Sequence, residues 1–220
     1  MRSLGRISCV VVLLFVASRI VSRAPLQAAA PEKAPAVPAP PPADLQQIVT
    51  QQFGPDFKIV TKSPSAGIVA ATAMGDDITP WSPLFTGDLN GDGSEDAVII
   101  ARNKNAVIGA KAYHYKVVDA YNDHFGYGNP EVTVDFNGDD PLHNMLLLVI
   151  HGAGKEGWRA ATPLAKFVLI NIPFEGVSLT KGELKHRTVD AIRVEESDTV
   201  SSVVFWDGKK YRYLPGGGTN

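Results

Sequence analysis

The spacing of hydrophobic residues changes once along the chain, from helical spacing to the pattern of β-strands. This change predicts one helix followed by strands. Between residues 45 and 53 the apolar side chains recur at helical spacing, so they fall on one face of an amphipathic helix. Asp44 and Gln47 are spaced to form a capping box at its start, and Gly54-Pro55 is a typical helix end. The apolar face consists of Leu45, Ile48, Val49 and Phe53.

The rest of the chain has the pattern of β-strands. Three near-continuous apolar runs are too short for typical helices and are typical of strands buried on both faces. They are residues 96–101, 145–150 and 167–172. Shorter or more exposed strands are predicted at 57–61, 177–180 and 191–194.

A β-hairpin is predicted at residues 202–213. Asp207-Gly208 is a type I′ turn signal between two runs rich in β-formers, and a two-residue loop would pair Trp206 with Lys209. We expect the apolar face of this hairpin to lie in the core, with an exposed binding platform as the alternative. That face carries Val204, Trp206, Tyr211 and Tyr213.

These elements predict a mainly β protein, with α+β as the alternative. We expect one domain over residues 44–214, built as an antiparallel sheet or sandwich, or as a small open barrel, with one short N-terminal helix. Residues 215–220 form a glycine-rich tail. A seven-bladed propeller is excluded, because blades of about 40–45 residues would need roughly 300 residues.

The first 30 residues have the pattern of a secretory signal peptide. A basic start precedes the apolar run 7–18, Arg19 ends that run before it could span a membrane, and three alanines at 28–30 suit a cleavage site. Cleavage and an uncleaved N-terminal anchor both remain open. Residues 31–43 are a proline- and alanine-rich linker. We therefore expect a secreted or periplasmic protein of a bacterial cell envelope, with membrane contact only through the signal or anchor.

The net charge of residues 31–220 argues against nucleic acid as a partner. The formal net charge is −2, but residues 1–30 hold four arginines and no acid, so the remainder carries 17 basic and 23 acidic residues. Nucleic-acid binding needs a basic footprint, and we expect none. The only cysteine, Cys9, lies in the signal segment, so the folded part has no disulfide and no thiolate metal site.

Residues 88–96 have the pattern of a metal-binding loop. Oxygen-bearing side chains occupy alternate positions of a nine-residue loop, with Gly93 at the sixth position, and Ca²⁺ is bound by six to eight oxygens. The twelfth position is Ile99 instead of the glutamate of an EF-hand, and a strand follows instead of a helix. The alternative is a metal-free acidic turn, although its four carboxylates would then repel one another. The candidate ligands are Asp88, Asn90, Asp92, Ser94 and Asp96.

Residues 85–100 (FTGDLNGDGSEDAVII) resemble the calcium loop of FG-GAP/VCBS-type repeats, which combine Phe-x-Gly, an Asp-x-Asn-x-Asp-Gly-x-x-Asp loop and an apolar strand. The resemblance implies side-chain ligation by Asp88, Asn90, Asp92 and Asp96, and ligation by the backbone carbonyl of Ser94. It covers these 16 residues and does not define the remaining fold.

A degenerate copy of this loop follows 47 residues later. Asp135, Asn137 and Asp139 repeat the first three ligand types, but Asp140 replaces the glycine at the sixth position. Two interpretations remain: a weaker second calcium site, or a loop that only forms a turn.

The glycine-rich segment after residue 150 matches two enzyme motifs incompletely. Residues 152–157 fit Gly-x-Gly-x-x-Gly, but Pro163 interrupts the helix that a dinucleotide site requires. Residues 149–154 resemble the oxyanion loop of some α/β-hydrolases, yet the sequence holds no Gly-x-Ser-x-Gly.

Together these observations favour an exported, non-catalytic calcium-binding module with a structural ion and an unidentified protein or carbohydrate partner. The alternative is a small secreted hydrolase that uses the region His151–Gly154. A Ser–His–acid cluster in the structure would favour the hydrolase, and an oxygen cage from Asp88, Asp92 and Asp96 would favour the calcium module.

Overall fold

The computed structural model describes residues 41–62, 82–126, 145–197 and 199–216. The chain divides into two units, Met1–Ala36 and Val37–Asn220, and all described residues belong to the second. The predicted signal segment and the degenerate loop with Asp135, Asn137 and Asp139 lie outside the described residues. Export therefore remains a prediction. No described helix is long and apolar enough to cross a membrane.

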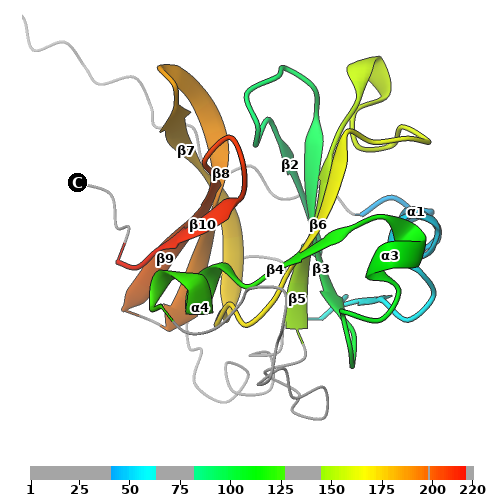
Figure 1. The fold of residues 1–220 in the computed structure, drawn as a ribbon, viewed down its shortest axis with the longest axis horizontal. Coiled ribbons are helices and arrows are strands. Elements are labelled where there is room, and N and C mark those ends of the chain that lie inside the picture. Colours follow the sequence, from blue (N-terminus) through cyan, green and yellow to red (C-terminus); the bar gives the residue numbers. More distant parts are fainter. Residues whose placement is uncertain (1–40, 63–81, 127–144, 198, 217–220) are drawn as a thin grey trace, which may run out of the picture. The chain divides into compact units, whose positions relative to one another are not determined.

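The first sheet has six strands (Figure 1). They run in the order β1-β3-β5-β6-β4. The strands β1 and β2 both pair with the same edge of β3, at its two ends. Every pair is antiparallel except β4 with β6. The strands are β1 Lys58–Ile59, β2 Leu84–Gly87, β3 Asp96–Arg102, β4 Lys116–Val118, β5 Met145–His151 and β6 Ala165–Leu169.

This sheet is buried on both faces, which explains its apolar runs. Along β5, residues 145, 147 and 149 pack in one core cluster and residues 146, 148 and 150 in a second. The second cluster is covered by α1 (Leu45–Phe53), whose bounds match the predicted helix. The predicted capping box is wrong in one respect, because the Asp44 side chain makes no capping hydrogen bond. The run predicted at 167–172 is a strand only to Leu169, since Asn171 has a φ of +57°.

The second sheet is a four-stranded antiparallel meander, β7-β8-β9-β10. Its strands are β7 Gly176–Leu184, β8 Arg187–Ser197, β9 Val200–Trp206 and β10 Tyr211–Leu214. Its inner face completes the first core cluster with Ile192, Val194, Val204, Tyr211 and Tyr213. The two sheets therefore pack against each other, and within the described residues neither closes into a barrel. The mainly β fold is confirmed.

Three short helical segments complete the described elements. They are α3 Ala110–Tyr113, α4 Ala120–His124 and the 3₁₀ turn η1 Gly154–Glu156. Residues 120–124 pack on β10 through ring contacts, with Tyr121 lying 5.1 Å from Tyr213 between centroids.

The strand register of the terminal hairpin differs from the predicted one. Trp206 pairs with Tyr211, so the loop comprises four residues, 207–210, and the predicted pair of Trp206 with Lys209 is wrong. The Asp207 carboxylate accepts bonds from the backbone N–H groups of Lys209 and Lys210 at 2.8 and 2.9 Å, and these bonds stabilise the longer loop. Because the shift is two residues, the same side chains still face the core.

Replacing Trp206 with alanine should lower the free energy of unfolding by about 2–3 kcal/mol, because its half-buried indole packs against three core rings. The centroids of His151, Phe167 and Tyr211 lie 5.1–5.4 Å from it. Urea denaturation measures the change. Leu214→Ala is the control, since Leu214 is 50% exposed on the opposite face. Equal stabilities for the two variants would show that the indole is not part of the core.

Candidate functional site

The predicted calcium loop is the turn between β2 and β3. Gly87 pairs with Asp96, so the antiparallel ladder closes the loop at its base (Figure 1). Gly91 and Gly93 have φ values of +77° and +84°, which side chains with a Cβ rarely adopt. These two glycines therefore allow the tight curl that brings alternate residues toward one point.

The side chains at the start of the loop bind its own backbone. The Asp88 carboxylate accepts from the N–H of Gly91 at 2.8 Å and from that of Gly93 at 3.0 Å. The carbonyl oxygen of the Asn90 side chain accepts from Asp92 N, and the Asp92 carboxylate accepts from Ser94 N. Each carboxylate oxygen has about two lone pairs, so these bonds leave acceptor capacity for a cation.

Asp96 is buried beneath the loop. Its side chain is fully buried and accepts from Gly152 N at 2.7 Å and from Leu89 N at 2.8 Å. The pKa of this carboxyl is raised to about 7, mainly by burial and to a smaller extent by the nearby Asp92 and Asp88, against the opposing effect of the two backbone bonds. Asp96 therefore ties the start of the loop to the end of β5.

The loop also has partners that sequence reasoning missed. Asp190 of β8 accepts from Asp88 N at 3.0 Å, and its own N–H donates to Asp88 O at 2.8 Å. The Lys181 ammonium lies 2.6 Å from the Asp190 carboxylate. Arg187 donates to the carbonyl of Gly91 at 3.0 Å. All these residues lie about 90 positions or more away in the chain, so no local pattern indicates them.

The ligand set fits calcium in part. Among the described residues, no group of three or more histidine, cysteine or carboxylate side chains is placed to hold a metal ion. The predicted set has three carboxylates, those of Asp88, Asp92 and Asp96, together with the amide of Asn90 and the carbonyl of Ser94. Carboxylate, amide and carbonyl oxygens are the donors that Ca²⁺ prefers. Asp96 would contribute its charge and its remaining lone pairs from below the loop.

The glycine-rich segment supports this loop. A Cβ at Gly152 would lie 2.2 Å from the carbonyl oxygen of Glu95, and one at Gly157 would lie 2.7 Å from the same atom. The segment continues into the three-residue turn η1, not the helix of a dinucleotide site. The Gly-x-Gly-x-x-Gly pattern is thus explained by close backbone packing.

His151 lacks the surroundings of a catalytic base. Its ring is 3% exposed and its Nε2 lies 2.8 Å from the Tyr211 hydroxyl. Burial lowers the pKa of His151 to about 4, so the imidazole is neutral at pH 7. In the part of the chain that the structure describes, no serine, threonine or cysteine side chain hydrogen-bonds to this ring. Among the described residues, His151 therefore has no hydrogen-bonded nucleophile of the kind that the hydrolase alternative needs.

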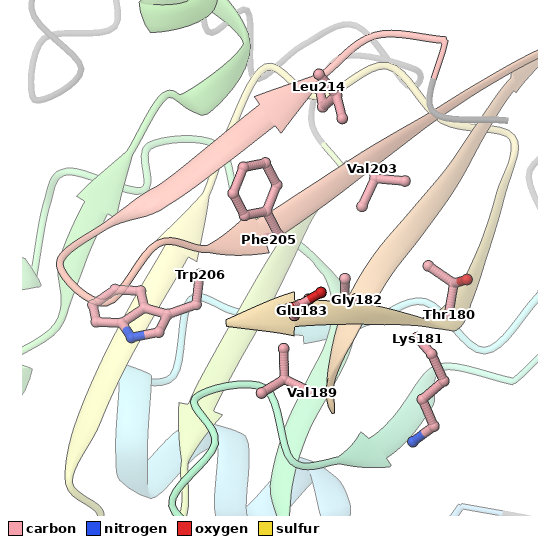
Figure 2. Close-up of a pocket in the computed structure, with 10 residues that line it drawn as sticks. Thr180, Lys181, Gly182, Glu183, Val189, Val203, Phe205, Trp206 and Leu214 are labelled. Carbon is pink, nitrogen blue, oxygen red and sulfur yellow. The ribbon is translucent and has the colours of Figure 1, made fainter. Parts of the chain in front are cut away.

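Two cavities share Trp206, and residues of the loop line the second of them. The apolar cavity, of about 350 Å³, lies over the outer face of the second sheet, with Trp206 at one end and Val203, Phe205 and Leu214 along one wall (Figure 2). The cationic cavity, of about 400 Å³, lies between the loop and the tips of two hairpins. It is lined by Asn90, Gly91, Leu184, Lys185, Arg187, Trp206 and Gly208.

Comparisons of the chain with protein-family models, with curated proteins and with solved structures find no match.

Proposed function

We propose that this protein is an exported, non-catalytic calcium-binding module of a bacterial cell envelope, with a loop of the FG-GAP/VCBS type. The supporting observation is the curled turn 88–96, in which Asp88, Asn90 and Asp92 present oxygens around two glycines of positive φ. The ion would be structural. The module would recognise a protein or carbohydrate partner through neighbouring surfaces.

Charge gives the physical reason for a cation. Asp88 and Asp92 both act electrostatically on the buried Asp96, so three carboxylates share a small volume. Asp190 adds a fourth on the far side of Asp88, where Lys181 pairs with it. A bound Ca²⁺ would remove the repulsion among the loop carboxylates. It would also stabilise the packing of the loop against β5 and β8.

Calcium is expected to raise the melting temperature by several degrees. At a hundredfold excess over the dissociation constant, binding to the folded state alone adds about 2.7 kcal/mol. Melts in millimolar Ca²⁺ and in chelator measure this difference. Asp88→Ala and Asp92→Ala should abolish it, and Mg²⁺ should substitute poorly because it prefers tighter octahedral geometry.

Glu95→Ala is the matched control within the same loop. The Glu95 side chain is 50% exposed and pairs with Arg159 at 3.3 Å, away from the candidate ligands. This variant should keep the calcium response. If calorimetry detects no Ca²⁺ binding in the millimolar range and chelator leaves the melt unchanged, the loop is a metal-free turn and the calcium proposal fails.

A further inference from the structure

The cationic cavity carries two positive side chains that no carboxylate neutralises within the described residues. Lys185 lies in the β7–β8 turn with a φ of +48°, and its Nζ lies 3.7 Å from the position that a Cβ on Gly208 would take. The ammonium therefore reaches across to the β9–β10 loop. Arg187 donates one N–H to the Gly91 carbonyl, and its guanidinium has four further N–H donors.

Trp206 is the aromatic residue that lines this cavity. Part of the indole packs against His151, Phe167 and Tyr211, and the remainder lines the cavity. Gly91 and Gly208 contribute backbone to the other walls, where Val189 lies beside Gly91 and Lys185 lies beside Gly208. The volume of about 400 Å³ lies in the lower part of the range of roughly 300–1,000 Å³ that is typical of small-molecule sites.

The neighbouring charges limit how negative the ligand can be. Asn90, which lines the cavity, hydrogen-bonds to Asp92, so the carboxylates of the loop lie close behind this wall. A polyphosphate or a nucleic acid would be repelled by them, whereas a single carboxylate facing Lys185 and Arg187 would be attracted on balance. A compact ligand with one negative charge and one apolar face fits these constraints.

We propose that the cationic cavity binds a uronate, a sugar ring that carries one carboxylate. The ring stacks on Trp206, and the carboxylate accepts charge-assisted hydrogen bonds from Lys185 and Arg187. This assigns a ligand class to the binding role proposed above, on which it rests. It does not require calcium in the loop.

The test is calorimetric titration of the purified protein with galacturonate, which carries one carboxylate, and, separately, with its methyl ester. Titrations in chelator exclude complexes between uronate and calcium, and are repeated in millimolar Ca²⁺. We expect galacturonate to bind at least tenfold more tightly than the ester, which keeps the ring but lacks the charge. Lys185→Gln should weaken binding of the acid about tenfold, which corresponds to the loss of one charge-assisted bond.

Lys209→Gln is the matched control. Lys209 is an exposed lysine of the β9–β10 loop that does not line the cavity, so its loss should leave the affinity unchanged. Equal affinity for the acid and the ester, equal losses in the two lysine variants, or no binding by the wild-type protein would each overturn the proposal. If uronate does not bind but Ca²⁺ still raises the melting temperature, only the ligand class is rejected. Uronate binding without a calcium response would reject only the metal.

Discussion

Gly152→Ala is expected to destabilise the protein by about 3–5 kcal/mol, enough to unfold a marginally stable domain. The added Cβ would lie 2.2 Å from Glu95 O and 2.5 Å from the carbonyl carbon of Gly157. Both obstacles are backbone atoms, so no side-chain rotation can relieve the overlap. Moving Gly152 would also break the bond of its N–H to Asp96. Chemical denaturation, with circular dichroism as the readout, measures the loss.

Gly154→Ala is the control within the same segment. No atom lies within 4 Å of the position that its Cβ would take, and only its φ of +59° disfavours alanine. We expect this variant to lose about 1 kcal/mol. If Gly152→Ala is as stable as Gly154→Ala, the segment does not pack against the loop 88–96.

The second large effect is expected on acidification. The pKa of His151 falls from about 6.5 in the unfolded chain to about 4 in the fold, because the ring is buried. Above pH 6.5 the imidazole is neutral in both states. As pH falls from 6.5 to 4 the unfolded chain takes up the proton first, so stability is lost across this window. The full contribution is about 3 kcal/mol at 1.36 kcal/mol for each pKa unit.

His151→Gln isolates this contribution, because glutamine can still accept from Tyr211 but does not titrate. The raised pKa of Asp96 acts in the opposite direction over nearly the same range, so the measured quantity is the difference between the wild-type and variant stabilities at each pH. This difference should fall by about 3 kcal/mol from pH 7 to pH 4. A difference that stays constant with pH would show that the imidazole is not buried in its neutral form.

The secondary-structure elements that were predicted correctly are those whose hydrophobic pattern lies within a short stretch of the sequence. Residues 96–101 and 145–150 are apolar at every or nearly every position because their sheet is covered on both faces, by α1 on one side and by the meander on the other. The helix at 45–53 follows from its one apolar face. Inward and outward positions of the terminal hairpin could also be assigned, because they depend only on alternation.

Features that depend on distant partners could not be predicted. The loop of the hairpin is stabilised by hydrogen bonds that the Asp207 carboxylate accepts, and a two-residue turn signal does not show which backbone N–H groups will donate them. Strand β4 has three residues and owes its place to parallel pairing with β6, about 50 positions away. In the candidate site, spacing identifies Asp88, Asn90 and Asp92. It does not indicate Asp190 or the two cations of the adjoining cavity.

The order of strands in the meander also bears on how the chain folds. Each of its pairs, β7–β8, β8–β9 and β9–β10, joins neighbours in sequence, so closing them costs little loop entropy. The first sheet brings β1 to β3 and β3 to β5 over longer separations, and such contacts form more slowly. The meander can therefore form early, but its inner face has no cover until the first sheet assembles. During that interval Ile192, Val194 and Val204 are exposed together, and such exposed apolar surface favours aggregation.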